Sequence, residues 1–101
     1  MPKRHVYQFE WDPVKAIENV KKHNVAFDRA ATVFLDAAAA SIYDDEHSED
    51  EDRWITLGID RIGIILVVSH TFREQSESSA RIRLISARKA TKKEITDYRR
   101  K

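Results

Sequence analysis

The sequence contains no cysteine among its 101 residues. Disulfides and thiolate zinc sites both need cysteine, so the chain has neither, and a reducing compartment such as the cytoplasm suits it. The amino terminus lacks the apolar segment of a signal peptide, and no apolar run approaches the ~20 residues of a membrane-spanning helix. Internal repeats and domain linkers are also missing. The sequence predicts one cytoplasmic domain over residues 1–101, without membrane contact.

Charges of both signs are abundant, but they are unevenly placed. The formal net charge is only +1, and charged residues make up 35% of the chain. Residues 44–52, DDEHSEDED, hold seven acids and no lysine or arginine, so the rest of the chain carries +8. Residues 81–101 hold nine basic side chains against Glu94 and Asp97. This separation predicts a basic surface suited to a polyphosphate partner.

Hydrophobic periodicity and capping residues define the amino-terminal half. Residues 6–11 alternate weakly between polar and apolar and predict a short strand. Asp12 and Pro13 are typical of a helix start, and Asn24 suits the left-handed residue at a helix end. A second helix is expected over 27–35, where apolar side chains recur at helical spacing and the helix stops near Asp36.

Four extended segments and a last helix follow. Residues 41–44, 53–60, 62–71 and 80–88 read as strands in an antiparallel meander, with a turn at 61–63. Residues 73–79 have turn and solvent composition. The capping-box residues Thr91 and Glu94 open a carboxyl-terminal helix. The order β-α-α-β-β-β-β-α predicts an α+β domain.

The predicted strand at 80–88, ARIRLISAR, contains three arginines and is the first candidate for a functional site. Strict alternation places Arg81 and Arg83 side by side on one face, together with Ile85 and Ala87. The following helix adds Lys92 and Lys93 in its first turn. The whole basic cluster is expected to contact the phosphates of a polyphosphate partner, and it consists of Arg81, Arg83, Arg88, Lys89, Lys92 and Lys93. An ordinary solvated surface is the alternative for each of these side chains.

Several segments resemble the BrnT family, the toxins of bacterial type II toxin–antitoxin pairs. They are FEWDPVKAIENVKKHNVAF, AATVFLD, DDEHSEDEDRWITLG, LVVSHT and RIRLISARKATKKEITDY, in the family's order and spacing over roughly residues 9–98. The resemblance implies a RelE-like fold, with a small curved antiparallel sheet, two amino-terminal helices and one carboxyl-terminal helix. It also implies ribonuclease action on mRNA that arrests translation.

The same resemblance implies the partners. A BrnA-like antitoxin is expected to neutralise the toxin, and operator DNA is expected to be bound only through that antitoxin. Two toxin copies in the complex, as a homodimer, are compatible with this picture. No cofactor is expected.

Metal-free RNA cleavage needs a proton acceptor for the 2′-hydroxyl, cations around the phosphorane and a proton donor for the leaving 5′-oxygen. Arg81 and Arg83 are the first candidates for holding the scissile phosphate, because arginine binds phosphate oxygens bidentately. Ion pairing across the sheet is their alternative role. His70 is a candidate acid or base if it faces the same side, which depends on strand register. His47, in the acidic segment, is a candidate proton donor.

Tyr98 and the acidic segment 44–52 each allow two roles. Tyr98 either stacks on an RNA base or packs against the sheet. The acidic segment 44–52 either mimics phosphate against the basic surface or binds a metal, although it lacks the glycine of an EF-hand loop. We expect no metal site. The alternative functions are a non-catalytic nucleic-acid or partner-binding module and a metal-dependent nuclease.

Overall fold

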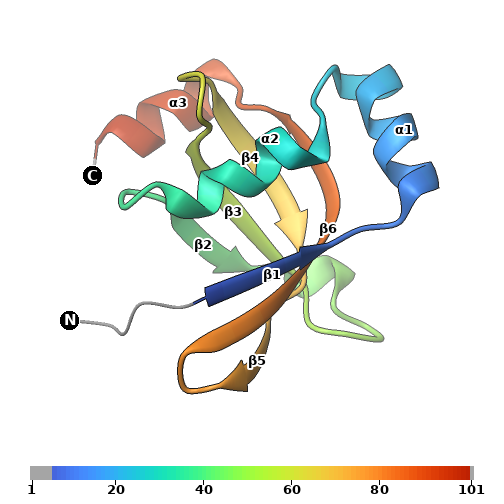
Figure 1. Cartoon of the computed structure of the whole chain (residues 1–101). Coiled ribbons are helices and arrows are strands. Elements are labelled where there is room, and N and C mark those ends of the chain that lie inside the picture. Colours follow the sequence, from blue (N-terminus) through green and yellow to red (C-terminus); the bar gives the residue numbers. More distant parts are fainter. Residues whose placement is uncertain (1–5, 101) are drawn as a thin grey trace.

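The computed structural model of the chain describes residues 6–100, and its element order confirms the predicted α+β class (Figure 1). Six strands, three α-helices and two short 3-10 helices are formed by these residues. In chain order they are β1 (Val6–Glu10), α1 (Pro13–His23), α2 (Phe27–Ala31), η1 (Thr32–Leu35), β2 (Ala40–Tyr43), η2 (Asp45–His47), β3 (Trp54–Ile59), β4 (Ile65–His70), β5 (Arg73–Ser76), β6 (Ser79–Lys89) and α3 (Lys92–Arg99). Lys101, counted among the basic residues above, lies outside the described part.

The helix boundaries follow the predicted capping chemistry. Asp12 caps α1 by accepting a hydrogen bond from the backbone N–H of Val14 at 2.8 Å. Asn24 ends α1 in the left-handed conformation with φ of 57°. The predicted helix over 27–35 is present but changes type, because its second half winds as the 3-10 helix η1. Thr91 and Glu94 form the expected capping box of α3.

The sheet has the strand order β1-β6-β4-β3-β2, with β5 also paired to β6. The run β2, β3, β4 and β6 is antiparallel throughout, which confirms the predicted meander. β1 lies parallel to β6, at the sheet edge opposite β2. The interpretation of residues 73–79 as a solvent turn is confirmed at residues 77–78 but was wrong for residues 73–76, which form β5. Backbone pairing with β6 defines this strand, whose four side chains are all exposed.

A bulge in β6 changes which residues face the core. Ser69 pairs with Ser86 whereas His70 pairs with Leu84, so Ile85 has no direct partner on β4. An unpaired extra residue shifts the alternation by one. Ala87 is therefore buried at 1% exposure, and its predicted place on the face of the two arginines was wrong.

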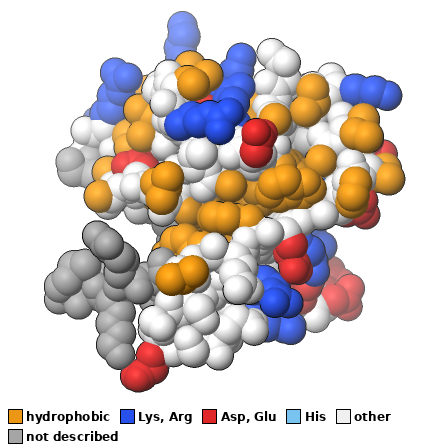
Figure 2. Space-filling view, in the orientation of Figure 1, with side chains coloured by type: hydrophobic (Ala, Val, Ile, Leu, Met, Phe, Trp, Pro, Cys, Tyr) orange, Lys and Arg blue, Asp and Glu red, His pale blue; other side chains and the backbone are white. Residues whose placement is uncertain are grey.

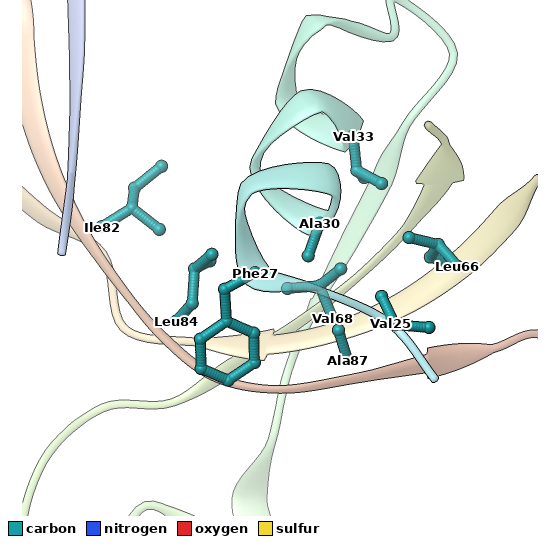
Figure 3. Close-up of a cluster of buried hydrophobic side chains, with 9 residues drawn as sticks. All are labelled: Val25, Phe27, Ala30, Val33, Leu66, Val68, Ile82, Leu84 and Ala87. Atoms are coloured by element: carbon teal, nitrogen blue, oxygen red, sulfur yellow. The ribbon is translucent and has the colours of Figure 1, made fainter. Parts of the chain in front are cut away.

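The core lies between α2, η1 and one face of the sheet, where α2 crosses the strands (Figures 1 and 3). Its buried side chains are Val25, Phe27, Ala30, Val33, Leu66, Val68, Ile82, Leu84 and Ala87. One polar side chain, Asn19 of α1, joins this core. Its amide nitrogen donates to the carbonyls of Val25 and Ala87, both at 2.8 Å, and its oxygen accepts from the Ala87 N–H at 3.1 Å. These bonds satisfy the buried amide and hold α1 against β6.

Within residues 6–100, every helix is too short or too polar to cross a membrane.

Candidate active site

Three arginines line one cavity of about 320 Å³ beside the β5–β6 hairpin. Arg73 and Arg81 are direct cross-strand partners, and Arg83 follows two residues later on the same face of β6. Like charges placed opposite each other destabilise a strand pair, so this arrangement favours an anion between them. The remaining lining residues are Glu10, Asp50, Glu51, Asp52, Thr71 and Phe72.

Carboxylates occupy this cavity together with the arginines. Glu51, in the acidic segment, accepts a hydrogen bond from Nη2 of Arg83 and forms an ion pair with it. Arg81 is held more loosely, because its Nε lies 3.8 Å from Glu10 and its Nη2 3.4 Å from the Gln8 side-chain oxygen. The Arg81 and Arg83 side chains remain 48% and 40% exposed. Both guanidinium groups can therefore be reached from solvent.

Local hydrogen bonds fold the acidic segment into a closed loop. Ser48 Oγ donates to the Asp44 carbonyl at 2.6 Å and accepts from the Arg53 N–H at 3.0 Å. Backbone pairing continues between the Asp44 N–H and the Arg53 carbonyl at 2.9 Å. This closure explains how a segment with seven acids reaches the basic strand through Glu51.

His47 belongs to this loop and lies next to the arginine cavity. Its Nδ1 is 2.9 Å from Asp44 Oδ2, and its side chain is 63% exposed. It lines a cavity of about 180 Å³ together with Glu51, which also borders the arginine cavity. The structure therefore places His47 in a cavity that shares Asp50 and Glu51 with the arginine cavity.

His70 lies on the opposite face of the sheet from Arg83. It is 2% exposed, pairs in register with the buried Leu84, and packs edge-to-face on Phe34 with ring centroids 4.8 Å apart. Both ring nitrogens of His70 are hydrogen-bonded: Nε2 to the Thr56 hydroxyl at 2.6 Å, and Nδ1 to the Thr71 carbonyl at 2.9 Å. Burial lowers the pKa of the His70 imidazole. His70 was a candidate acid or base only if it faced the same side as the arginines. Its pairing with the core-facing Leu84 places it on the other side.

The other predicted RNA-contacting residues lie at the far end of β6 and on α3, outside the arginine cavity. Arg88 donates to both carboxylate oxygens of Glu94, at 2.8 and 2.9 Å. Lys93 lies 3.4 Å from Asp97, and Lys89 and Lys92 are exposed. Tyr98 donates its hydroxyl to Asp36 at 2.5 Å, which ties α3 to the end of η1.

The arginine cavity and a neighbouring cavity that also contains Arg83 are lined by basic residues that sequence reasoning missed. Arg73 was assigned to a solvent turn, and only the β5–β6 register reveals its place opposite Arg81. Lys15 and Arg53 line a cavity of about 260 Å³ with Arg83. The Arg53 Nε is buried without a hydrogen-bond partner among the described residues. The sequence did offer one indication that Arg53 could belong to the site, because it lies directly between the acidic residues 44–52 and the strand β3.

No group of three or more histidine or acidic side chains in residues 6–100 is arranged to hold a metal ion.

A family model described as the ribonuclease toxin BrnT of type II toxin–antitoxin systems matches residues 11–94. The chain belongs to the BrnT family. This match confirms the resemblance found in the sequence, and it identifies the chain as a ribonuclease toxin of a type II system. Membership of such a pair implies an antitoxin partner. The matched span contains Arg73, Arg81 and Arg83, so the cavity lies inside the family domain.

A solved structure of a BrnT toxin resembles this chain. The 1.1 Å crystal structure of the Brucella abortus ribonuclease toxin BrnT superposes with a TM-score of 0.54 at 21% sequence identity. The match covers 91% of this chain and 100% of that one. Comparison with curated proteins gives no match. The structural likeness supports the fold of this BrnT family member.

Proposed function

We propose that this BrnT family toxin is a RelE-like, metal-independent endoribonuclease that cleaves mRNA and arrests translation. A BrnA-like antitoxin would neutralise it and would carry the complex, with one or two toxin copies, to operator DNA. The observation that carries the proposal is the convergence of Arg73, Arg81 and Arg83 on one solvent-open cavity within a ribonuclease toxin domain.

The arginines act on the phosphate during cleavage. The 2′-oxygen attacks the neighbouring phosphorus, the bond to the 5′-oxygen breaks, and the products carry a 2′,3′-cyclic phosphate and a 5′-hydroxyl. Negative charge accumulates on the non-bridging oxygens of the phosphorane. Arg81 and Arg83 hold these oxygens, and Arg73 adds a third guanidinium from β5. Bidentate arginine contacts also fix the phosphate orientation.

Proton transfer requires a base for the 2′-hydroxyl and an acid for the 5′-oxygen. Glu10 lines the cavity beside Arg81, and we assign its carboxylate the role of base. His47 is the histidine that borders the neighbouring cavity, and we assign it the role of acid. His70 receives no catalytic role, because both of its ring nitrogens are already hydrogen-bonded on the other face.

RNA on either side of the cut would follow the remaining basic surface. Arg88, Lys89, Lys92 and Lys93 lie along the end of β6 and the start of α3, where phosphate contacts add affinity without sequence information. Tyr98 serves the fold, since its hydroxyl is held by Asp36. Glu51 takes the place of a phosphate on Arg83 in the free toxin and leaves when RNA binds.

The test is cleavage of single-stranded RNA by the purified toxin in excess EDTA, with analysis of the product ends. We expect cyclic phosphate ends, and a loss of roughly 10²–10³-fold in rate for Arg83→Ala, as for removal of one donor to a transition-state oxyanion. Arg81→Ala should also lose activity. Arg61→Ala removes the same charge from the β3–β4 turn and is the matched control.

Each other outcome contradicts the proposal in a defined way. RNA binding without cleavage indicates a non-catalytic binding module. Cleavage that returns only with divalent ions indicates a metal-dependent nuclease. A folded Arg81→Ala, Arg83→Ala double variant that still arrests growth removes these arginines from the mechanism.

A further inference from the structure

A second cavity, of about 270 Å³, shares Phe72 with the arginine cavity. Its aromatic walls come from four separate parts of the chain: Tyr7 of β1, Phe34 of η1, Trp54 of β3, and Phe72 between β4 and β5. Hydrophobic side chains gather in a band between α2 and β1 on this side of the molecule (Figure 2). Ser41 and His70 supply the polar groups of the lining.

The direction of a hydrogen-bond chain determines what Ser41 offers to this cavity. The Thr71 carbonyl can only accept, so Nδ1 of His70, 2.9 Å away, carries the proton. Burial lowers the pKa of the His70 ring and so favours its neutral form, in which Nε2 accepts from the Thr56 hydroxyl at 2.6 Å. Thr56 in turn accepts from Ser41, whose Oγ lies 2.6 Å away. Ser41 therefore has lone pairs, and no proton, left for a ligand.

We propose that this aromatic cavity binds one nucleobase of the RNA strand and selects adenine or cytosine. The inference rests on the proposed function, since the base belongs to the strand whose phosphate Arg81 and Arg83 hold. Phe72 lies between the two cavities and would stack on the base, with its exposed fraction of 38% making it accessible. Stacking on aromatic rings is the usual way that proteins hold single-stranded bases.

Size and polarity both favour a single base. The volume lies below the ~300–1,000 Å³ of pockets for drug-sized ligands, which suits one flat ring system. Adenine and cytosine carry an amino group at the position where guanine and uracil carry a carbonyl oxygen. The Ser41 oxygen can accept from the amino group, but it would face the lone pairs of the carbonyl. This contrast gives the selectivity.

The experiment titrates the full-length chain with the 5′-monophosphates of adenosine, guanosine, cytidine and uridine, and follows the two tryptophan indole N–H signals by NMR. We expect the Trp54 signal to shift while that of Trp11, outside this cavity, serves as internal control. Adenosine and cytidine monophosphates should bind about fivefold more tightly than their carbonyl counterparts, as one neutral hydrogen bond allows.

Three variants separate stacking from selection. Phe72→Ala should weaken all four nucleotides by roughly tenfold or more, because it removes one stacking surface. Ser41→Ala should abolish the preference, and Ser41→Thr, which keeps the hydroxyl, should retain it. Ser41 is exposed on the edge strand β2, so both changes spare the core.

The results distinguish this inference from the ribonuclease proposal. A Trp54 signal unmoved by millimolar nucleotide, or a Ser41→Ala chain that keeps the preference, overturns the base site. If Trp54 responds but RNA is not cut, the base site stands and the ribonuclease proposal fails. If RNA is cut with an identical site pattern by the unmodified, Ser41→Ala and Phe72→Ala chains, the base site fails and the ribonuclease proposal stands.

Discussion

Replacing Glu51 with glutamine should make the toxin bind RNA more tightly. In the free protein the Glu51 carboxylate is paired with Arg83, so an RNA phosphate must displace it before it can use that guanidinium. Both side chains are more than one-third exposed, at 36% and 40%, and water and salt therefore screen the pair. An exposed pair of this kind is worth about 0–1 kcal/mol. Since ~1.4 kcal/mol corresponds to tenfold, the dissociation constant should fall by up to about fivefold.

The assay is fluorescence anisotropy with a labelled RNA that carries 2′-deoxy nucleotides, which bind but are not cut. Glu49→Gln is the matched control, because it removes the same charge from the same loop but lies outside the arginine cavity. The advantage of Glu51→Gln over this control should shrink at high salt, where surface electrostatics are screened.

Two results would refute the reasoning. RNA affinity that is unchanged or weaker in Glu51→Gln would show that Glu51 does not compete with phosphate. An equal gain in Glu49→Gln would show that the overall charge of the loop, and no specific contact, is responsible.

Three further variants test the fold around the site. Gly58→Ala should lower the free energy of unfolding in urea by about 1–3 kcal/mol, because its Cβ would lie 2.7 Å from a buried valine methyl. Hydrogen bonding to Arg88 lowers the pKa of Glu94 from 4.5 to about 2. The stability that the ionised Glu94 provides is therefore complete above pH 4.5 and is lost as the pH falls towards 2. Glu94→Gln should therefore flatten the decline of stability over that range, measured by urea unfolding at each pH. Tyr98→Phe loses its bond to Asp36 and should destabilise the chain by about 1 kcal/mol without changing RNA affinity.

Each of these three predictions has a result that would contradict it. An unchanged urea midpoint would show that the sheet adjusts around an alanine at position 58. Acid unfolding of the Glu94→Gln chain that matches the unmodified chain would remove the carboxylate from the pH dependence. Weaker RNA binding by Tyr98→Phe would return that hydroxyl to the interface.

Local signals in the sequence were enough for most elements of the fold. The cap at Asp12, the left-handed Asn24 and the capping box at Thr91 depend on near neighbours in the chain, and each is formed as predicted. β5 escaped prediction because its residues are polar and exposed and show no hydrophobic alternation. Its pairing with the β6 backbone cannot be inferred from local sequence.

The site depends on contacts between residues far apart in sequence, which periodicity does not report. One unpaired residue, Ile85, moves Ala87 to the core face and His70 into register with Leu84. The contact between Glu51 and Arg83 joins residues 32 apart, and it follows from how the acidic loop closes. Sequence reasoning therefore found Arg81 and Arg83 but missed Arg73, which reaches them through a hairpin register.

The most direct test of the central claim is an NMR titration of the arginine Nε–H signals with a short RNA that is 2′-deoxy at every position preceding a phosphate. We predict that the Nε–H signals of Arg81 and Arg83 shift on binding, while that of Arg61, on the β3–β4 turn, does not. Saturable binding that leaves the Arg81 and Arg83 signals unmoved would show that the phosphate lies elsewhere, and it would contradict the proposed active site.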